Sequence, residues 1–312
     1  MLSVAVLVDD NQSDLKLEWL AGTRGKSRHI ANDGRAAADL IGHLNLTHPG
    51  RIQVFGQEEL DYFLRFPNER RLQMLQELVD GGVPAILLAD AIQVSEEVRQ
   101  ICEQADIPLL GTSMTAAETI DILRIYLARR GAPRTLMHGV FMDVLGLGVL
   151  ITGESGLGKS ELALELITRG HGLVADDAVE FSRPSPRAID GHCPELLQNM
   201  LEVRGLGLLN IRTIFGETAM RQRMRLKLIV HLVRASADEQ FERLPMQDLY
   251  QEVLGEPVLK VILQVAAGRN LAVLVEAAVR NTVLKLRGID TLQEFLTKQT
   301  QAIAQGRRDD AS

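Results

Sequence analysis

One segment of eight residues near the middle of the chain limits the possible folds more than any other feature. It reads Gly153, Glu154, Ser155, Gly156, Leu157, Gly158, Lys159 and Ser160, and it matches the pattern G-x-x-x-x-G-K-[ST] in full. A β-rich run at residues 149–152 precedes it, and a helical pattern begins at Ser160. The order of strand, glycine-rich loop and helix predicts a P-loop in an α/β domain rather than a chance glycine-rich turn.

The residue types in this segment predict binding of nucleotide phosphates. Its glycines allow successive backbone N–H groups to turn toward phosphate oxygens, and the start of the following helix adds positive potential. Lys159 can reach the terminal phosphates, and the hydroxyl of Ser160 can ligate Mg²⁺. We therefore expect this loop to hold a nucleotide together with Mg²⁺.

Two adjacent carboxylates, Asp176 and Asp177, follow a second β-rich run. A P-loop enzyme needs an acidic residue near Mg²⁺ and a group that positions the nucleophile. Neighbouring side chains on an extended segment point to opposite sides, so one carboxylate can face the metal and the other an incoming hydroxyl. If one of them is a general base, the second anion beside it raises its proton affinity. A solvated acidic turn is the alternative interpretation.

The length of the chain, 312 residues, suits two domains, because a domain usually spans roughly 100 to 200 residues. Strands are predicted at residues 51–56, 85–89 and 108–111, and helices at 69–78, 96–104 and 115–128. A run of arginines with glycine and proline then indicates a connector. We predict an N-terminal α/β domain over residues 1–128, a linker over 129–136, and a P-loop α/β domain with C-terminal helices over 137–312.

Other local patterns predict further elements. The opening run MLSVAVLVDD is predicted to be a strand, and residues 139–144 and 149–152 a hairpin that leads into the P-loop. Basic and apolar side chains alternate over residues 221–228, which predicts a strand; a solvated edge is favoured over a contact with phosphate or an acidic partner. An amphipathic helix is expected at residues 270–286, followed by a second, short helix.

Composition excludes several classes of protein. The formal charge, 34 basic minus 41 acidic residues or -7, argues against a nucleic-acid binder that neutralises phosphates. The two cysteines, Cys102 and Cys193, lie far apart and outside CxxC spacing, so neither a disulfide framework nor a zinc site is indicated, and a reducing cytoplasm fits. No apolar window approaches the ~18 residues of a membrane helix, so no membrane association is expected.

Three sequence blocks carry a more specific resemblance. The first runs from His138 through the P-loop to HGLVADD, the second is LEVRGLGLLN at residues 201–210, and the third is GRNLAVLVE at residues 268–276. In this order they resemble the catalytic domain of the HPr kinase/phosphorylase family. The second block is far rarer than a P-loop. The resemblance covers essentially the whole chain and is weaker in the first domain, where RIQVFGQEEL is the most similar stretch.

The resemblance implies roles for individual residues. Residues 153–160 would bind ATP, with Ser160 and Glu202 on Mg²⁺ and with Lys159 neutralising the phosphates. Asp177 matches the residue that takes the proton of a serine hydroxyl and returns it in the reverse reaction. Two further active-site positions match His138 and Arg243; without the resemblance, His138 would be taken for a structural histidine and Arg243 for a surface arginine.

The resemblance also marks a loop that matters for dephosphorylation. It consists of Gln264, Val265, Ala266, Ala267, Gly268 and Arg269. The family often carries proline in this loop, so the two alanines change its rigidity. Asn210 stands at a position that is frequently acidic in the family. We expect activity to survive both departures, with a change in the balance between the two directions.

The family implies a bifunctional enzyme of the cytoplasm. It would phosphorylate a serine of the phosphocarrier protein HPr with ATP, and remove that phosphate with inorganic phosphate to give pyrophosphate. A homohexamer is implied, with the C-terminal helices at subunit contacts. The alternatives are a non-catalytic module that senses nucleotides, and a small-molecule kinase. The presence of Lys159, Asp177 and Glu202 favours an enzyme over the sensing module.

Overall fold

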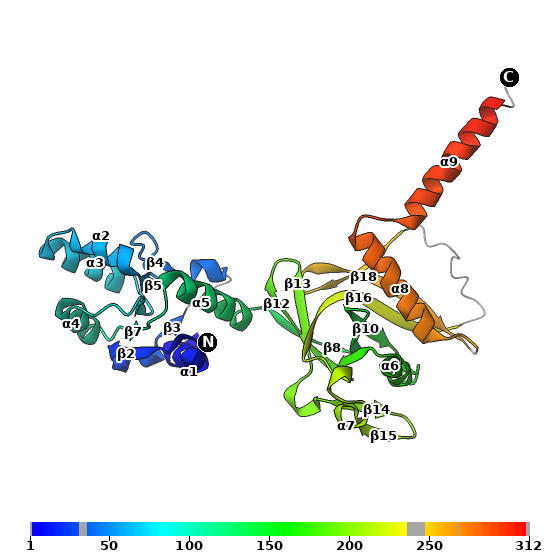
Figure 1. Ribbon diagram of the computed structural model, residues 1–312, viewed down its shortest axis with the longest axis horizontal. Helices are drawn as coiled ribbons and strands as arrows, with labels where there is room; N and C mark the ends of the chain where they lie inside the picture. The colour runs from blue at the N-terminus through cyan, green and yellow to red at the C-terminus, as the bar shows by residue number, and fades with distance from the viewer. Residues whose placement is uncertain (1, 31–35, 236–246, 267, 310–312) are drawn as a thin grey trace. The chain divides into compact units, whose positions relative to one another are not determined.

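The computed structural model describes residues 2–30, 36–235, 247–266 and 268–309, and their side chains as far as residue 300. The chain forms two compact units, Met1–Ala132 and Pro133–Ser312 (Figure 1). Helix α5 (Ala116–Arg130) ends the first unit and strand β8 (Arg134–His138) begins the second. Between them only residues 131–133 lie outside a helix or strand, a shorter connection than the linker proposed at residues 129–136.

The first unit is built on a five-stranded sheet with the order β2-β7-β6-β5-β4. Strands β4 to β7 are parallel, and β2 runs antiparallel to β7. The strands are β1 (Leu2–Ser3), β2 (Glu18–Ala21), β3 (His29–Ile30), β4 (Ile41–His43), β5 (Ile52–Phe55), β6 (Ile86–Leu88) and β7 (Leu109–Gly111). The other helices are α1 (Val4–Leu15), α2 (Gln57–Leu64), α3 (Asn68–Asp80) and α4 (Glu96–Gln104). The strands and helices predicted between residues 51 and 128 are confirmed.

Helices cover both faces of this sheet. Side chains of α1 and α5 pack on one face with Val54 and Leu87 of the strands. Side chains of α2, α3 and α4 pack on the other face with Phe55 and Leu88. Successive strand residues therefore point into different cores, which explains why these short strands are almost continuously apolar.

The prediction of a strand for the opening residues is wrong beyond β1. Residues 4–15 form helix α1, whose first turn is capped by Ser3: the hydroxyl accepts a hydrogen bond from the backbone N–H of Val6. The buried residues of α1 follow a helical spacing and are Val4, Leu7, Val8, Asn11 and Leu15. Burial against the sheet outweighs the strand preference of the valines.

The second unit contains a nine-stranded sheet with the central order β11-β9-β10-β16-β13-β12-β8, and β17 and β18 continue it beside β16. A separate hairpin joins β14 to β15. The strands after β8 are β9 (Val140–Val144), β10 (Leu147–Gly153), β11 (Gly172–Ala175), β12 (Ala178–Ser185), β13 (Ala188–His192), β14 (Met200–Val203), β15 (Gly207–Asn210), β16 (Arg223–Arg234), β17 (Leu249–Val253) and β18 (Glu256–Val265). The β9–β10 hairpin confirms the hairpin predicted before the P-loop.

Strand β16 is confirmed as a strand and is solvated at its start, but it is not an edge strand of the sheet. Its first residues pair with β13, and the rest lies between β10 and β18. Leu228, Ile229 and Val230 are fully buried, whereas Arg223 and Arg225 near its start are exposed. The alternation of basic and apolar side chains describes only the first part of a long central strand.

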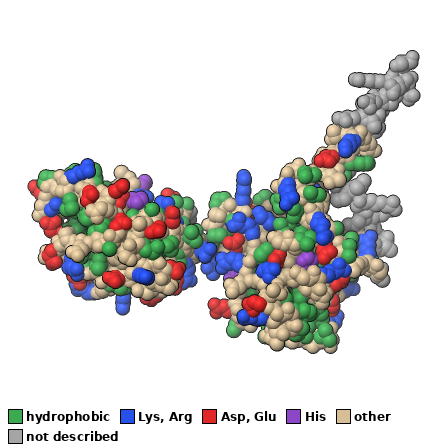
Figure 2. Space-filling model, in the orientation of Figure 1, with side chains coloured by type: hydrophobic (Ala, Val, Ile, Leu, Met, Phe, Trp, Pro, Cys, Tyr) green, Lys and Arg blue, Asp and Glu red, His purple; other side chains and the backbone are tan. Residues whose placement is uncertain are grey.

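Helices α6 (Lys159–Thr168) and α8 (Leu271–Leu286) cover one face of this sheet (Figure 1). Helix α7 (Ile211–Phe215) follows the β14–β15 hairpin, and α9 (Thr291–Asp309) follows α8 and is longer than the short helix predicted. Over the described ranges, every helix is too short or too polar to cross a bilayer. Basic and acidic side chains are interspersed over the first unit on the face that Figure 2 shows.

Candidate active site

The predicted P-loop joins a buried strand to a helix. Strand β10 ends at Gly153, and α6 begins at Lys159. Gly156 and Gly158 have φ of +80° and +82°, a backbone conformation that favours glycine. Gly158 is the N-cap of α6 and provides no side chain to cap it. The N–H groups of the first turn therefore stay available to an anion, which is the arrangement that binds phosphate.

The side chain of Lys159 folds back over the loop. Its Nζ donates hydrogen bonds to the carbonyl oxygens of Gly153 and Glu154, each at 3.0 Å. The ammonium group is thus held above the segment that would surround a phosphate. These carbonyl contacts can be exchanged for phosphate oxygens without moving the helix.

A histidine supports the last residue before the loop. The hydroxyl of Thr152 in β10 lies 2.9 Å from Nδ1 of His231 in the neighbouring parallel strand β16. Burial and the positive charge of Lys260 lower the pKa of His231, so the imidazole is neutral at neutral pH. This contact is not predictable from the sequence, because it depends on the register between β10 and β16.

The adjacent carboxylates Asp176 and Asp177 lie in different environments. Asp176 is only 8% exposed, and its Oδ2 accepts a hydrogen bond from the backbone N–H of Glu202 at 2.9 Å. Burial raises the pKa of Asp176, although the hydrogen bonds it accepts oppose this effect. The side chain of Asp177 is 84% exposed. The two carboxylates lie in different environments, but Asp177 has φ of +62° and is not in the extended segment on which the prediction was based.

His138 lies beside Asp177. Its Nδ1 is 3.2 Å from the backbone carbonyl oxygen of Asp177 and 4.0 Å from the carboxylate Oδ1. The contact follows from pairing of β8 with β12, in which His138 is opposite Ala178, the residue after Asp177. Both side chains are largely exposed, so a macromolecular substrate can reach them.

The β14–β15 hairpin brings two further charged residues to this region. Glu202 is exposed in β14, and its backbone is held by Asp176. Arg204 lies in the turn of the hairpin and reaches the P-loop. If Gly156 carried a Cβ atom, that atom would lie 3.6 Å from Nη1 of Arg204. Arg204 belongs to the motif LEVRGLGLLN, but its position near the P-loop was not predicted from the sequence. Asn210, one of the departures from the family, caps α7 through its side chain.

The loop predicted to serve dephosphorylation follows β18. Gln264 and Val265 end that strand, and Arg269 is exposed just before α8. The side chain of Asn270 caps α8 and also donates a hydrogen bond to Oε1 of Glu165 in α6, the P-loop helix, at 3.1 Å. The loop is therefore connected to the helix that begins at the P-loop.

Sheet topology brings most of these positions to one edge. Strands β10, β16 and β18 are parallel, and β11 is antiparallel to β9, which is antiparallel to β10. The P-loop, the two aspartates and residues 264–266 thus all follow carboxyl ends of strands that run the same way. Ligands bind at this edge in α/β sheets. Arg243 and Ala267 lie outside the described residues, and the roles assigned to all the site residues stay predictions.

The residues suggested for Mg²⁺ suit that ion chemically. Ser160 and Glu202 offer a hydroxyl and a carboxylate, and Mg²⁺ is usually held by one or two such groups together with substrate phosphates and water. Over the described part of the chain, no group of three or more His, Cys, Asp or Glu side chains could hold a metal alone. A site completed by nucleotide phosphates is compatible with both observations.

Comparison with known families accounts for both units. Residues 2–127 match the family model described as HPr Serine kinase N terminus, and residues 129–299 match the model described as HPr Serine kinase C-terminal domain. A solved structure described as the Hpr(Ser) kinase/phosphatase from Coxiella burnetii shares 35% identity, covers 52% of this chain and 98% of its own, and has a TM-score of 0.46.

Curated relatives match over nearly the full length. HPr kinase/phosphorylase of Bordetella avium (strain 197N) is 67% identical over 305 residues, which cover 98% of this chain and 99% of that protein. HPr kinase/phosphorylase of Cupriavidus necator is 56% identical over 301 residues, 95% of this chain and 93% of that protein. The chain belongs to the HPr kinase/phosphorylase family.

Proposed function

We propose that this protein phosphorylates a serine of the phosphocarrier protein HPr with ATP, and removes the phosphate by phosphorolysis with release of pyrophosphate. The observation that carries the proposal is one shared sheet edge. A P-loop with an uncapped helix start and a folded-back Lys159 lies on the same edge as an exposed carboxylate, Asp177. A phosphate site and a reachable base are the two parts that transfer to a protein hydroxyl requires.

In the kinase direction, the backbone N–H groups of the loop and the charge of Lys159 hold the phosphates of ATP. Asp177 accepts the proton of the serine hydroxyl as that oxygen attacks the γ-phosphorus, and the bond to the β-phosphate oxygen breaks. Its exposure supports this role, because the attacking serine belongs to another protein. His138, beside Asp177, orients the carboxylate through the backbone and side-chain contacts described above.

In the reverse direction, inorganic phosphate occupies the position of the ATP β-phosphate. One of its oxygens attacks the phosphorus of phosphoserine, the serine oxygen leaves with a proton from Asp177, and the products are pyrophosphate and free HPr. Residues 264–269 serve the capture of free phosphate. This role is supported by Arg269, which is exposed between the end of β18 and the start of α8.

Ser160 and Glu202 would hold Mg²⁺, which supplies positive charge for the phosphate oxygens when bound. Asp176 supports this arrangement from inside the protein by holding the backbone of Glu202. Arg243 would contribute a second cation at the transferring group. We further propose a cytoplasmic homohexamer in which the C-terminal helices lie at subunit contacts; Leu286 of α8 and Phe295 of α9 are exposed apolar residues suited to such contacts.

The proposal is tested by incubating the protein with HPr, Mg²⁺ and ATP, and following HPr by intact mass. We expect one phosphoryl group to be added, and the product to lose it when inorganic phosphate replaces ATP. Replacing the target serine of HPr by alanine is the control, and no phosphorylation should then occur. A non-catalytic nucleotide sensor would bind ATP in the same preparation and leave the mass of HPr unchanged.

A further inference from the structure

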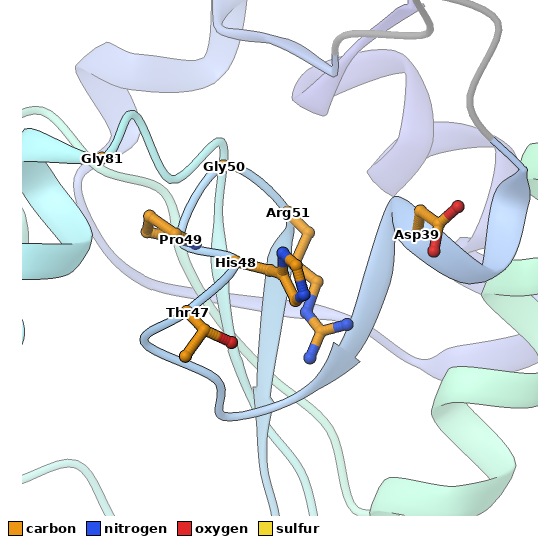
Figure 3. Close-up of a pocket in the computed structure, with 7 residues that line it drawn as sticks. All are labelled: Asp39, Thr47, His48, Pro49, Gly50, Arg51 and Gly81. Atoms are coloured by element: carbon orange, nitrogen blue, oxygen red, sulfur yellow. The ribbon is translucent and has the colours of Figure 1, made fainter.

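The first unit contains a pocket that the proposed reaction does not use. It lies where the chain enters β4 and β5, and its volume is about 490 Å³. The polar side chains that line it belong to Asp39, Thr47, His48 and Arg51 (Figure 3). Ligand pockets of proteins commonly have volumes of about 300–1,000 Å³, so this pocket has room for a small molecule.

Arg51 enters the pocket with most of its hydrogen-bonding capacity unused. Its Nη2 donates to the carbonyl oxygen of His43 at 3.3 Å, and its buried Nε has no partner among the described residues. Guanidinium groups carry five N–H donors, and buried donors are normally satisfied. Figure 3 shows His48 and Arg51 among the residues that line the pocket.

The absence of a side chain at residue 42 makes room for this guanidinium. Gly42 lies in β4, and a Cβ added there would be 3.1 Å from Cζ of Arg51 and 3.2 Å from its Nη1. Such contacts are tighter than those ordinarily found around a Cβ. The position of the arginine head therefore depends on a close approach to the backbone of the neighbouring strand.

A second arginine acts electrostatically on the first. Arg124 in α5 also has a buried Nε without a partner among the described residues. Burial and the positive charge of Arg124 lower the pKa of Arg51, while the carboxylate of Asp39 opposes this shift. Two cations repel each other, and a doubly charged oxyanion bound to Arg51 in the pocket would relieve that repulsion and accept free N–H groups of Arg51.

We propose that this pocket, the Arg51 pocket, binds the phosphoryl group of a small phosphate ligand through Arg51, with Arg124 of α5 adding positive charge. Asp39 at the wall of the pocket can accept a hydrogen bond from a hydroxyl of the ligand, whereas the Thr47 hydroxyl already donates to Oδ1 of Asn45. The pocket belongs to the first unit, whereas the P-loop belongs to the second. The inference does not depend on the proposed transfer reaction.

Hydrogen–deuterium exchange of the full-length protein gives a local readout for this site. The probes are glycerol 3-phosphate, a simple hydroxylated phosphomonoester, and inorganic phosphate. We expect peptides from residues 41–55 to become protected as the probe concentration rises. The same protection should appear in Lys159→Ala, because that substitution affects only the P-loop. Stronger protection by glycerol 3-phosphate identifies an organic phosphate as the ligand; stronger protection by inorganic phosphate identifies the free ion.

Matched arginine variants test the assignment. Arg51→Gln should raise the half-saturating probe concentration about tenfold or more, because a charge-assisted hydrogen bond is lost, and Arg124→Gln should raise it by a smaller factor, because only a neighbouring positive charge is lost. Arg129→Gln alters an exposed residue near the end of α5, the helix that carries Arg124, and should leave the half-saturating probe concentration unchanged. If Arg51→Gln fails to fold, Arg124→Gln still decides the question. The proposal is overturned if neither probe protects the wild-type peptides, if protection survives both substitutions, or if Arg129→Gln weakens it equally.

Discussion

The carboxylate of Asp176 accepts a hydrogen bond from the backbone N–H of Glu202 at 2.9 Å. This contact joins the end of β11 to the hairpin that carries Glu202 and Arg204. A buried acid thereby anchors the hairpin whose Arg204 reaches the P-loop. The arrangement separates the structural acid, Asp176, from the exposed acid, Asp177.

Asp176→Asn should be neutral or stabilising at pH 7, whereas Asp176→Ala should lower the free energy of unfolding by about 1–3 kcal/mol. The amide oxygen of asparagine can still accept from Glu202, while alanine leaves a backbone N–H unpaired. Chemical denaturation monitored by circular dichroism measures both values. Equal destabilisation by the two substitutions would show that the charge of Asp176, and not the hydrogen bond, supports the hairpin.

The same residue predicts a dependence on pH. Because burial raises the pKa of Asp176 above its ordinary value of 3.8, its contribution to stability is fully present below pH 3.8 and is lost as the pH rises through the folded-state pKa. The stability of Asp176→Asn relative to wild type should therefore increase with pH over that interval and then become constant. Denaturation curves from pH 4 to pH 8 test this trend, and a flat difference would contradict it.

The local chemistry of the chain predicted the P-loop because loop, lysine and helix start are contiguous. The helix α1 was not predictable in the same way: its valines favour a strand, and only packing on the sheet selects the helix. The central position of β16 and the contact of Thr152 with His231 depend on strand partners that are remote in sequence. The different burial of Asp176 and Asp177 likewise requires the tertiary fold.

Asp177→Asn should lose far more rate than nucleotide affinity. An amide keeps the shape of the side chain but cannot accept the serine proton, and general base catalysis is typically worth ~10² to 10⁴-fold. Turnover with HPr and ATP affinity by calorimetry should be measured on one preparation. Equal losses in both would assign Asp177 to the metal and not to proton transfer.

Arg204→Gln should slow both directions by about 10- to 100-fold. Its guanidinium lies next to Gly156 of the P-loop, and a hydrogen bond to a charged group contributes roughly 1.5–3 kcal/mol. Arg187→Gln, an exposed arginine in the β12–β13 turn, is the control and should retain wild-type rates. Initial rates of phosphorylation and phosphorolysis measure the effect. If the Arg204→Gln variant keeps the wild-type rates, Arg204 does not contact the phosphate.

Arg269→Ala should lower phosphorolysis by a larger factor than phosphorylation and weaken the apparent affinity for inorganic phosphate. Free phosphate must be captured by the site, whereas the phosphate of ATP is already positioned by the rest of the nucleotide. Arg287→Ala, at the other end of α8, serves as the control. Equal losses in both directions, or a change of oligomeric state on size-exclusion chromatography, would make the loop structural.

The claim that one P-loop serves both reactions is tested most directly with Lys159→Ala. Phosphorylation of HPr, and release of pyrophosphate from phosphoserine-HPr with inorganic phosphate, should be measured for this variant and for wild type, with circular dichroism as the check on folding. Because Lys159 is the cation over the loop, we predict that the variant loses both activities while its fold is retained. A folded variant that keeps near-normal turnover in either direction would contradict the account.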